Sequence, residues 1–353
     1  MQVLNLDGDH FQMGWQHGQQ VLHLRPHIMA AIEARLKGLS RYGGLDAPLL
    51  ETLERKWREN AVSTLAMLRG IAAALALPFS QLFRYTAASY LEDSLQSRSQ
   101  AEACSVWAAS GPATRDGSPI LVKNRDYHLE HLPLQVLTYA TTQPGYRCLY
   151  VTSAGSPAVF SSGVNEAGLA VADTHVPSRD IGPGLARYTL MMDLLEQHAY
   201  VQSALSYLQK ALCMGAGSLI LADAQGNLAV VETGYHQCGL VMPEEHVVAA
   251  TNHFVTPELR EHFLDDRTGV RGEESRARCQ EIQARLKKEW GMLDTEIARQ
   301  VMAQHQAGSA AICRHHQNGE VGTISTAIFL PSERKLIFCN GRPCECDYAT
   351  YTL

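Results

Sequence analysis

The chain has 353 residues, of which 46% are hydrophobic and 19% charged, a composition typical of a globular protein and unlike disordered, collagen-like or coiled-coil chains. Its 30 basic and 36 acidic residues give a formal net charge of −6, which disfavours nucleic acid and anionic membrane surfaces as partners. The length fits one large domain or two modest ones.

The first part of the chain has a helical pattern, and the pattern changes near Ala101. Over residues 16–92, apolar residues recur at spacings of three and four, which predicts helices. From Ala101 the chain consists of short β-prone runs, and the pair Asp116-Gly117 predicts a tight turn between two strands. The strands of this hairpin contain Cys104 and Asp126, which we therefore expect to be neighbours.

Groups of strands and helices follow the hairpin. Helices are expected over residues 188–198, 202–212, 273–290 and 294–304. Strands are expected over residues 134–142, 148–153, 158–162, 169–173, 218–233 with a turn at 225–227, 246–254, and 323–341 with a turn at 331–334. This order predicts a layered α+β fold in which sheets stack and helices cover the outside.

The N-terminus and the cysteines bear on the location of the protein. Asp7, Asp9 and two glycines interrupt the stretch where a secretory signal needs basic and then apolar residues. No stretch reaches the roughly 18 apolar residues of a membrane-spanning helix. The nine cysteines have no framework spacing, which favours reduced thiols. We therefore expect a cytoplasmic protein without a membrane segment.

Two residue groups could carry nucleophilic chemistry. Cys104 is followed on the expected partner strand by Asn124, Arg125 and Asp126, and a thiol beside a carboxylate and cations can be an activated nucleophile. Asn252 follows an apolar strand, where its amide can stabilise an oxyanion. Taken alone, each has a simpler explanation, since strand cysteines fill cores and Asn is common in turns.

Cysteines and histidines near the C-terminus raise the question of a metal site. Cys313, His315 and His316, with Cys344 and Cys346, are of the residue types that bind zinc. Adjacent histidines and a Cys-x-Cys pair lack the usual gap of about two to four residues, so we expect no metal. Residues 214–218 are glycine-rich but lack the features of a phosphate loop, and no cofactor is expected.

Several short stretches, taken together, carry a family resemblance. They are AEACS at 101–105 and VKNRDY at 122–127, with GWQHG at 14–18, LRGIA at 68–72, GVNEAGL at 163–169, TNH at 251–253, ESR at 274–276 and GRPC at 341–344. In this order they resemble the acyl-coenzyme A:6-aminopenicillanic acid acyltransferase family, which is related to the choloylglycine hydrolases. These are N-terminal nucleophile (Ntn) hydrolases.

The resemblance implies a four-layer αββα Ntn-hydrolase sandwich of stacked antiparallel sheets with a helical N-terminal pro-segment. It also implies a zymogen that cuts itself autocatalytically between Ala103 and Cys104, separating residues 1–103 from a catalytic body of residues 104–353. The cut has a physical reason. A thiol with a pKa of about 8.5 needs a base, and an α-amine with a pKa of about 8 serves only when no peptide bond occupies it.

Catalytic roles follow from the same resemblance. Asp126 is implied to hold the freed amine, and Asn252 to stabilise the tetrahedral oxyanion. Ser275 and Arg276 are implied to order the site by hydrogen bonds and charge.

Substrate-binding roles are implied for Lys123, Arg125 and His175. Lys123 stands where bile-salt hydrolases have an arginine, and it lacks the planar fork that grips carboxylates, which disfavours bile-salt substrates.

The implied function is that of a hydrolase or acyltransferase acting on a small-molecule amide through a Cys104 thioester. Both outcomes remain open: the acyl group passes to water, as in an amidase, or to an amine, and an acyl-thioester is a further candidate co-substrate. The lack of a phosphate-binding motif favours hydrolysis. The alternative is an unprocessed, catalytically silent protein in which residues 1–103 cover the cleft in a binding or structural role. A monomer and a dimer are both compatible with the sequence.

Overall fold

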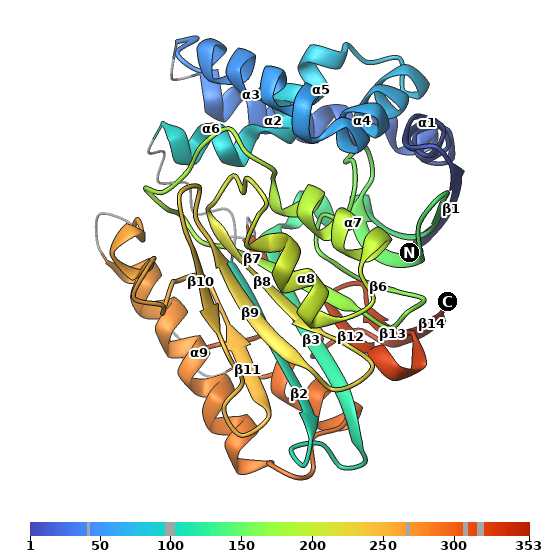
Figure 1. Ribbon diagram of the computed structural model, residues 1–353. Coiled ribbons are helices and arrows are strands. Elements are labelled where there is room, and N and C mark those ends of the chain that lie inside the picture. Colours follow the sequence, from blue (N-terminus) through green and yellow to red (C-terminus); the bar gives the residue numbers. More distant parts are fainter. Residues whose placement is uncertain (41–42, 96–102, 266–268, 306–309, 316–320) are drawn as a thin grey trace.

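Two stacked β-sheets form the centre of the protein, shown as a computed structural model in Figure 1. The structure describes all residues except 41–42, 96–102, 266–268, 306–309 and 316–320. Sheet A contains, in spatial order, β1 (Gln2–Gly8), β4 (Gln135–Thr142), β5 (Arg147–Ser153), β6 (Ser162–Asn165), β7 (Ala170–His175), β8 (Gly217–Ala222), β9 (Leu228–Thr233) and β10 (Cys238–Val241). Sheet B contains β11 (Val247–Ala250), β2 (Ala103–Gly111), β3 (Gly117–His128), β12 (Val321–Leu330), β13 (Lys335–Cys339) and β14 (Tyr348–Thr352).

The helices fall into an N-terminal group and two later pairs. The N-terminal group, blue in Figure 1, gathers at one end of the molecule. It comprises α1 (His10–Gln20), α2 (Arg25–Ser40), α3 (Ala47–Asn60), α4 (Val62–Ala74), α5 (Phe79–Thr86) and α6 (Ala88–Ser94). The later pairs are α7 (Arg187–Gln197) with α8 (Val201–Leu208), and α9 (Val270–Lys288) with α10 (Thr295–Met302). None of the described helices is long and apolar enough to cross a membrane.

The central strands of both sheets are buried on two faces, which explains their nearly continuous apolar runs. Successive residues of a strand point to opposite faces. On β2, Val106 and Ala108 therefore belong to the core between the sheets, whereas Trp107 and Ala109 pack in the core formed with α9 and α10. The N-terminal helices, α7 and α8 cover the outer face of sheet A. The layer order is αββα, and the expected four-layer α+β fold is confirmed.

Some local expectations were wrong. The strand expected over residues 158–162 begins only at Ser162, because Ala158 has a left-handed backbone with φ 58° that turns the chain. Strand β1 precedes the helical segment and pairs in parallel with β4, its Leu4 and Leu6 buried beneath exposed Asn5 and Asp7.

Strands β1, β10 and β14 were not among the strands expected from the sequence. Among the cysteines, which the sequence favours as reduced thiols, Cys339 and Cys346 form a disulfide.

The N-terminal segment is built into the fold by contacts that do not depend on the peptide bond before Cys104. Its strand β1 pairs along its whole length with β4. The indole Nε1 of Trp57 donates a buried hydrogen bond of 2.9 Å to the carbonyl of Gly184, and the hydroxyls of Thr64 and Thr189 are 2.9 Å apart. Its apolar side chains share one core with sheet A, α7 and α8. Packing alone can therefore hold this segment in place.

Helices α1 and α4 cross at close range because glycines lie at the contact. A Cβ added at Gly14 would lie 2.0 Å from the Met67 carbonyl oxygen, and one added at Gly70 would lie 2.2 Å from the Phe11 carbonyl oxygen. Both distances are far below van der Waals contact, and a packed interior has no room to relax them. The stretches at 14–18 and 68–72 therefore contain the glycines that let the two helices touch.

We expect Gly14→Ala to lower the free energy of unfolding by about 1–3 kcal/mol, because the added methyl overpacks the α1–α4 contact. Gly38→Ala on α2 is a matched control, since that glycine is exposed with nothing within 4 Å of the added Cβ. The control should stabilise the protein by about 0.5–1 kcal/mol through helix propensity. Urea unfolding measures both. Equal effects of the two substitutions would contradict the packing explanation.

Candidate active site

The β2–β3 hairpin positions Cys104, as the Asp116-Gly117 turn indicated. Gly117 has φ +80°, and the Asp116 carboxylate accepts a hydrogen bond of 2.9 Å from the Ser118 amide, which stabilises the turn. In the resulting register Cys104 lies opposite Arg125 and Ala103 lies opposite Asp126. Asp126 is therefore placed beside the Ala103–Cys104 bond, one residue before the thiol. Residues 96–102, which precede this bond, lie outside the described part of the chain.

Cys104 lines a cavity of about 100 Å³ between the two parts of the chain, and it is 7% exposed. The body side of this cavity includes five charged side chains, namely Lys123, Arg125, Asp126, Asp173 and Arg187. The N-terminal helices contribute a second side that includes Arg35, Tyr85 and Asp93. Access to the thiol is thus bounded by both the body and the N-terminal segment.

The backbone of Cys104 is held by two buried polar side chains. Its N–H donates to Oδ1 of Asn252 at 2.9 Å. Its carbonyl accepts from Nη1 of Arg278 at 3.0 Å, and Nη2 of the same guanidinium donates to Asn252 Oδ1 at 2.9 Å. Asn252 Nδ2 donates to the carbonyl of His175 at 2.8 Å, which fixes the orientation of the amide. The arrangement fixes both the nitrogen and the carbonyl of the candidate nucleophile.

Helix α9 supplies Ser275 and Arg278 to this group but not Arg276. The Ser275 hydroxyl accepts a hydrogen bond of 2.8 Å from the backbone N–H of Asn252, and Ser275 is buried. Arg278, 2% exposed, lies one helical turn further on the same face. Arg276 lies on the exposed side of the helix, and none of the hydrogen bonds to Cys104 or Asn252 comes from it. Sequence reasoning missed Arg278, although its spacing of three from Ser275 was the signal that could have found it.

Asp126 is buried, and its carboxylate is hydrogen-bonded to a side chain on the neighbouring strand β12. Its Oδ1 accepts from the Thr323 hydroxyl at 2.6 Å. That hydroxyl in turn accepts from the backbone N–H of Arg314 at 2.8 Å. The segment before β12 therefore fixes the carboxylate that lies beside the bond between Ala103 and Cys104.

Lys123 is part of a buried charge cluster. Its ammonium donates to Asp173 Oδ1 at 2.5 Å and to the Ser161 carbonyl at 3.0 Å, and Arg187 Nε donates to the other Asp173 oxygen at 3.0 Å. Burial acts to raise the pKa of Asp173, but the charges of Lys123 and Arg187 outweigh it, so the pKa is lowered. Lys123 lines the cavity, with its ammonium engaged by the protein.

Arg125 and His175 line the same cavity from neighbouring sheets. The Arg125 guanidinium lies 3.3 Å from the Ser153 hydroxyl and stacks over the ring of Tyr127 at 5.3 Å. His175 Nε2 lies 2.9 Å from a carboxylate oxygen of Asp93 on α6. The second contact links the body to the N-terminal segment across the cavity.

The surroundings of the Cys104 thiol favour its protonated form in the intact chain, because they raise its pKa. Burial raises its pKa, and the carboxylates of Asp173 and Asp126 raise it further. The positive charge of Lys123 and a hydrogen bond with the backbone of Asp126 lower it, without compensating. A buried neutral thiol is a weak nucleophile, so attack on a carbonyl requires a nearby base.

The described residues considered for a metal site do not line the cavity that contains Cys104. The structure brings Cys313, His315 and Cys344 together. Cys346 is bonded to Cys339, and His316 lies outside the described residues.

The sequence comparison decides the family. The model of the family described as acyl-coenzyme A:6-aminopenicillanic acid acyl-transferase matches residues 113–345, more than half of the chain. The chain belongs to this acyltransferase family. The matched region begins after Cys104 and includes Asp126, Asn252 and Arg278. Membership of the acyltransferase family indicates an enzyme of the acyltransferase or amidase type.

Solved structures with a similar fold include two variants of a conjugated bile acid hydrolase from Clostridium perfringens. Each is 14% identical, with TM-scores of 0.46 and 0.48, covering 71% and 70% of this chain and 97% of the other. A penicillin V acylase from Agrobacterium tumefaciens is also 14% identical, with a TM-score of 0.44, covering 67% of this chain and 83% of its own. A search of curated protein sequences finds no match.

His253 is a half-buried histidine next to Asn252. Its Nδ1 lies 2.8 Å from the Ser275 hydroxyl. Burial, with the positive charges of Arg276 and Arg278, lowers its pKa from 6.5 to about 4. The folded protein therefore keeps this imidazole neutral over a pH range in which the unfolded chain binds a proton.

Stability is accordingly expected to fall as the pH is lowered from 6.5 to about 4, the interval in which only the unfolded state protonates His253. Between these limits the wild type should lose about 1–3 kcal/mol more than a His253→Gln variant. The exposed His27→Gln on α2 serves as a control and should keep the wild-type pH dependence. Urea unfolding at a series of pH values provides the measurement, and identical slopes for wild type and His253→Gln would refute the assignment.

Proposed function

We propose that the protein is an autoprocessing cysteine Ntn hydrolase that cleaves a linear amide through a thioester on Cys104. The observation that carries the proposal is the fixed backbone of Cys104, whose nitrogen is 2.9 Å from Asn252 Oδ1 and whose carbonyl is 3.0 Å from Arg278 Nη1. Strand β11 ends opposite Val106, so these two side chains take the place of a strand partner for the backbone of Cys104. They also hold in place the nitrogen that would become the catalytic amine.

The first step is cleavage of the chain before Cys104. The sulfur attacks the Ala103 carbonyl carbon, the bond from that carbon to the Cys104 nitrogen breaks, and the thiol proton ends on the nitrogen. Water then hydrolyses the resulting thioester, which leaves a carboxylate on Ala103 and restores the thiol. Asp126 lies opposite Ala103 in the β2–β3 register, so its carboxylate is the one we assign to the new amine.

Cleavage supplies the base that the buried thiol lacks. The new α-amine has an ordinary pKa of about 8, close enough to neutrality to accept the thiol proton. Asn252 Oδ1 already lies at hydrogen-bond distance from this nitrogen and orients it. Asp126 then stabilises the ammonium that forms while the sulfur attacks the substrate. The raised pKa of Cys104 makes such a base necessary.

Attack on the substrate amide follows the same geometry. Asn252 has two Nδ2 hydrogens, of which one is used by the His175 carbonyl. The other is assigned to the oxyanion, a contact worth roughly 3–4 kcal/mol of the barrier where such donors have been removed. The leaving amine takes the proton from the ammonium, the acyl group stays on sulfur, and water releases it. We assign water as the acceptor, and an amine is the alternative acceptor for the same thioester.

The cavity lining supports a polar acyl group as substrate. Lys123 and Arg187 share the single carboxylate of Asp173 in a buried cluster, and Arg125 and His175 are further polar side chains in the lining of the cavity. We assign these two side chains to the substrate and Lys123 to the support of Asp173.

Intact-mass measurement of the purified protein tests the processing step. The wild type should yield two fragments, residues 1–103 and 104–353, and Cys104→Ala should retain only the full-length mass and show no release of amine from any amide in a panel. Cys238→Ala, on β10 outside the cavity lining, should be processed like the wild type. A wild-type sample that keeps only its full-length mass would favour the silent protein, in which the contact between Asp93 and His175 keeps the cavity covered.

Arg278→Lys should slow both processing and amide turnover by about 10–100-fold, because a lysine cannot hold the Cys104 carbonyl and Asn252 Oδ1 at once. Arg276→Lys, two residues earlier on the exposed face of α9, should have no effect. Accumulation of the 104–353 fragment and the rate of amine release measure the two steps. Equal loss in both variants would show that the Arg278 contacts do not matter to the chemistry.

A further inference from the structure

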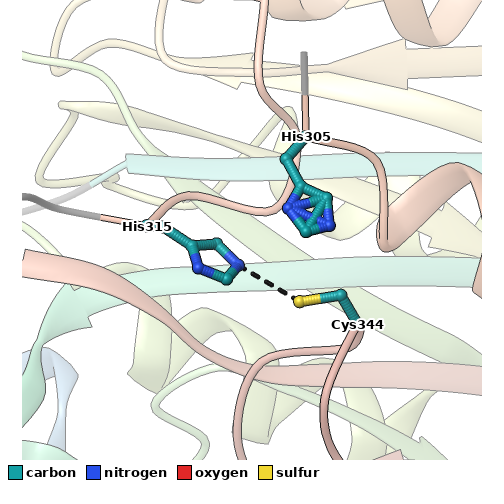
Figure 2. Close-up of side chains that lie close together, drawn as sticks. All are labelled: His305, His315 and Cys344. Carbon is teal, nitrogen blue, oxygen red and sulfur yellow. Dashed lines mark hydrogen bonds between the residues drawn. The ribbon is translucent and has the colours of Figure 1, made fainter. Parts of the chain in front are cut away.

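Two cysteines and two histidines from separate segments meet at one place outside the Cys104 cavity. His305 follows α10, Cys313 and His315 lie between α10 and β12, and Cys344 lies between β13 and β14. Figure 2 shows His305, His315 and Cys344 gathered with their side chains toward one another. Soft sulfur and imidazole donors are the ligands that zinc prefers.

The distances among these side chains are close to those of a metal site. Cys344 Sγ lies 3.1 Å from His315 Nε2, and Cys313 Sγ lies 3.5 Å from both of those atoms. In tetrahedral zinc sites, bond lengths of about 2.0–2.3 Å place neighbouring donor atoms about 3.3–3.8 Å apart. A ligand atom of His305 lies within 4.8 Å of those of His315 and Cys344, at the open side of the group.

The surroundings of His315 support the same interpretation. Its Nε2 faces the two sulfurs, and its other ring nitrogen, Nδ1, lies 3.8 Å from a carboxylate oxygen of Glu345. Metal-bound histidines commonly direct their second nitrogen toward a carboxylate, which fixes the ring. The ring of His305 stacks on that of His315 with centroids 4.8 Å apart. Two thiols that lose their protons supply the charge that balances a divalent cation.

We propose that His305, Cys313, His315 and Cys344 bind one zinc ion. The sequence spacing argued against a metal because it compared residues that are adjacent along the chain. The fold instead brings Cys344 to His315 across 29 residues. Cys313, His315 and Cys344 were among the residues that the sequence offered, His305 was not, and Cys346 is bonded to Cys339. A bound ion also fixes the backbone of Arg314, whose N–H supports Thr323.

Metal content of the intact, untagged protein tests the site directly. After incubation with zinc chloride and desalting, elemental analysis should find about one zinc per chain, the stoichiometry of a single four-ligand site. Cys344→Ser and the exposed His305→Gln should each weaken zinc binding by at least about 10-fold, the loss that even an outer-shell partner causes. Cys238→Ser and His27→Gln are the matched controls and should bind like the wild type. The bound ion should also shield two thiols from a thiol reagent.

Three results would overturn the site: less than about a tenth of a zinc per chain in the wild type, equal zinc in the wild type and His305→Gln, or a Cys313–Cys344 disulfide in peptide maps of the purified protein. His305→Gln keeps the test valid if Cys344→Ser does not fold, because His305 is exposed. Cys104→Ala should bind zinc normally, so the test of the zinc site does not depend on the proposed amide chemistry.

Discussion

The antiparallel pairing of β2 with β3 is the constraint on which the rest of the site depends. It places Ala103 opposite Asp126 and Cys104 opposite Arg125. A slip of one residue would send every side chain of β2 to the other face of sheet B and separate these groups. The core enforces the register, since Trp107 fits only among the helices and Val106 only between the sheets. Packing far from the thiol thus sets the position of the bond proposed to be cut.

Buried charges around this register are tolerated because each has an opposite or polar partner. Leaving one charge of such a group alone is costly, whereas a paired and hydrogen-bonded group is stable. Asp173 is shared by Lys123 and Arg187, and Arg278 divides its donors between Cys104 and Asn252. The polar network around the thiol is therefore rigid before any substrate arrives, which is the condition for electrostatic stabilisation of a transition state.

The N-terminal segment has two physical roles in this fold. It completes the core on the outer face of sheet A, through β1 and the close crossing of α1 with α4 at Gly14 and Gly70. It also supplies one side of the cavity, where Asp93 contacts His175. Packing would therefore hold this segment in place after the proposed backbone cut, and the lining of the cavity includes its side chains. In this member of the acyltransferase family, the N-terminal segment and the body thus pack together as one unit.

The stacking of sheets under outer helices was predictable from the sequence, because apolar periodicity and turn chemistry are properties of neighbouring residues. The Asp116-Gly117 turn and the apolar runs around Cys104 belong to this class. The choice of Cys104 as nucleophile came instead from the family resemblance and stays a prediction. Other features depended on contacts between distant segments, whose proximity is decided by how whole elements pack. The choice of Arg278 over Arg276 depends on which face of α9 meets sheet B, and the meeting of Cys344 with His315 depends on the path of two loops. Local sequence patterns determine which secondary structure a segment prefers. Only tertiary packing decides which segments contribute side chains to the same site.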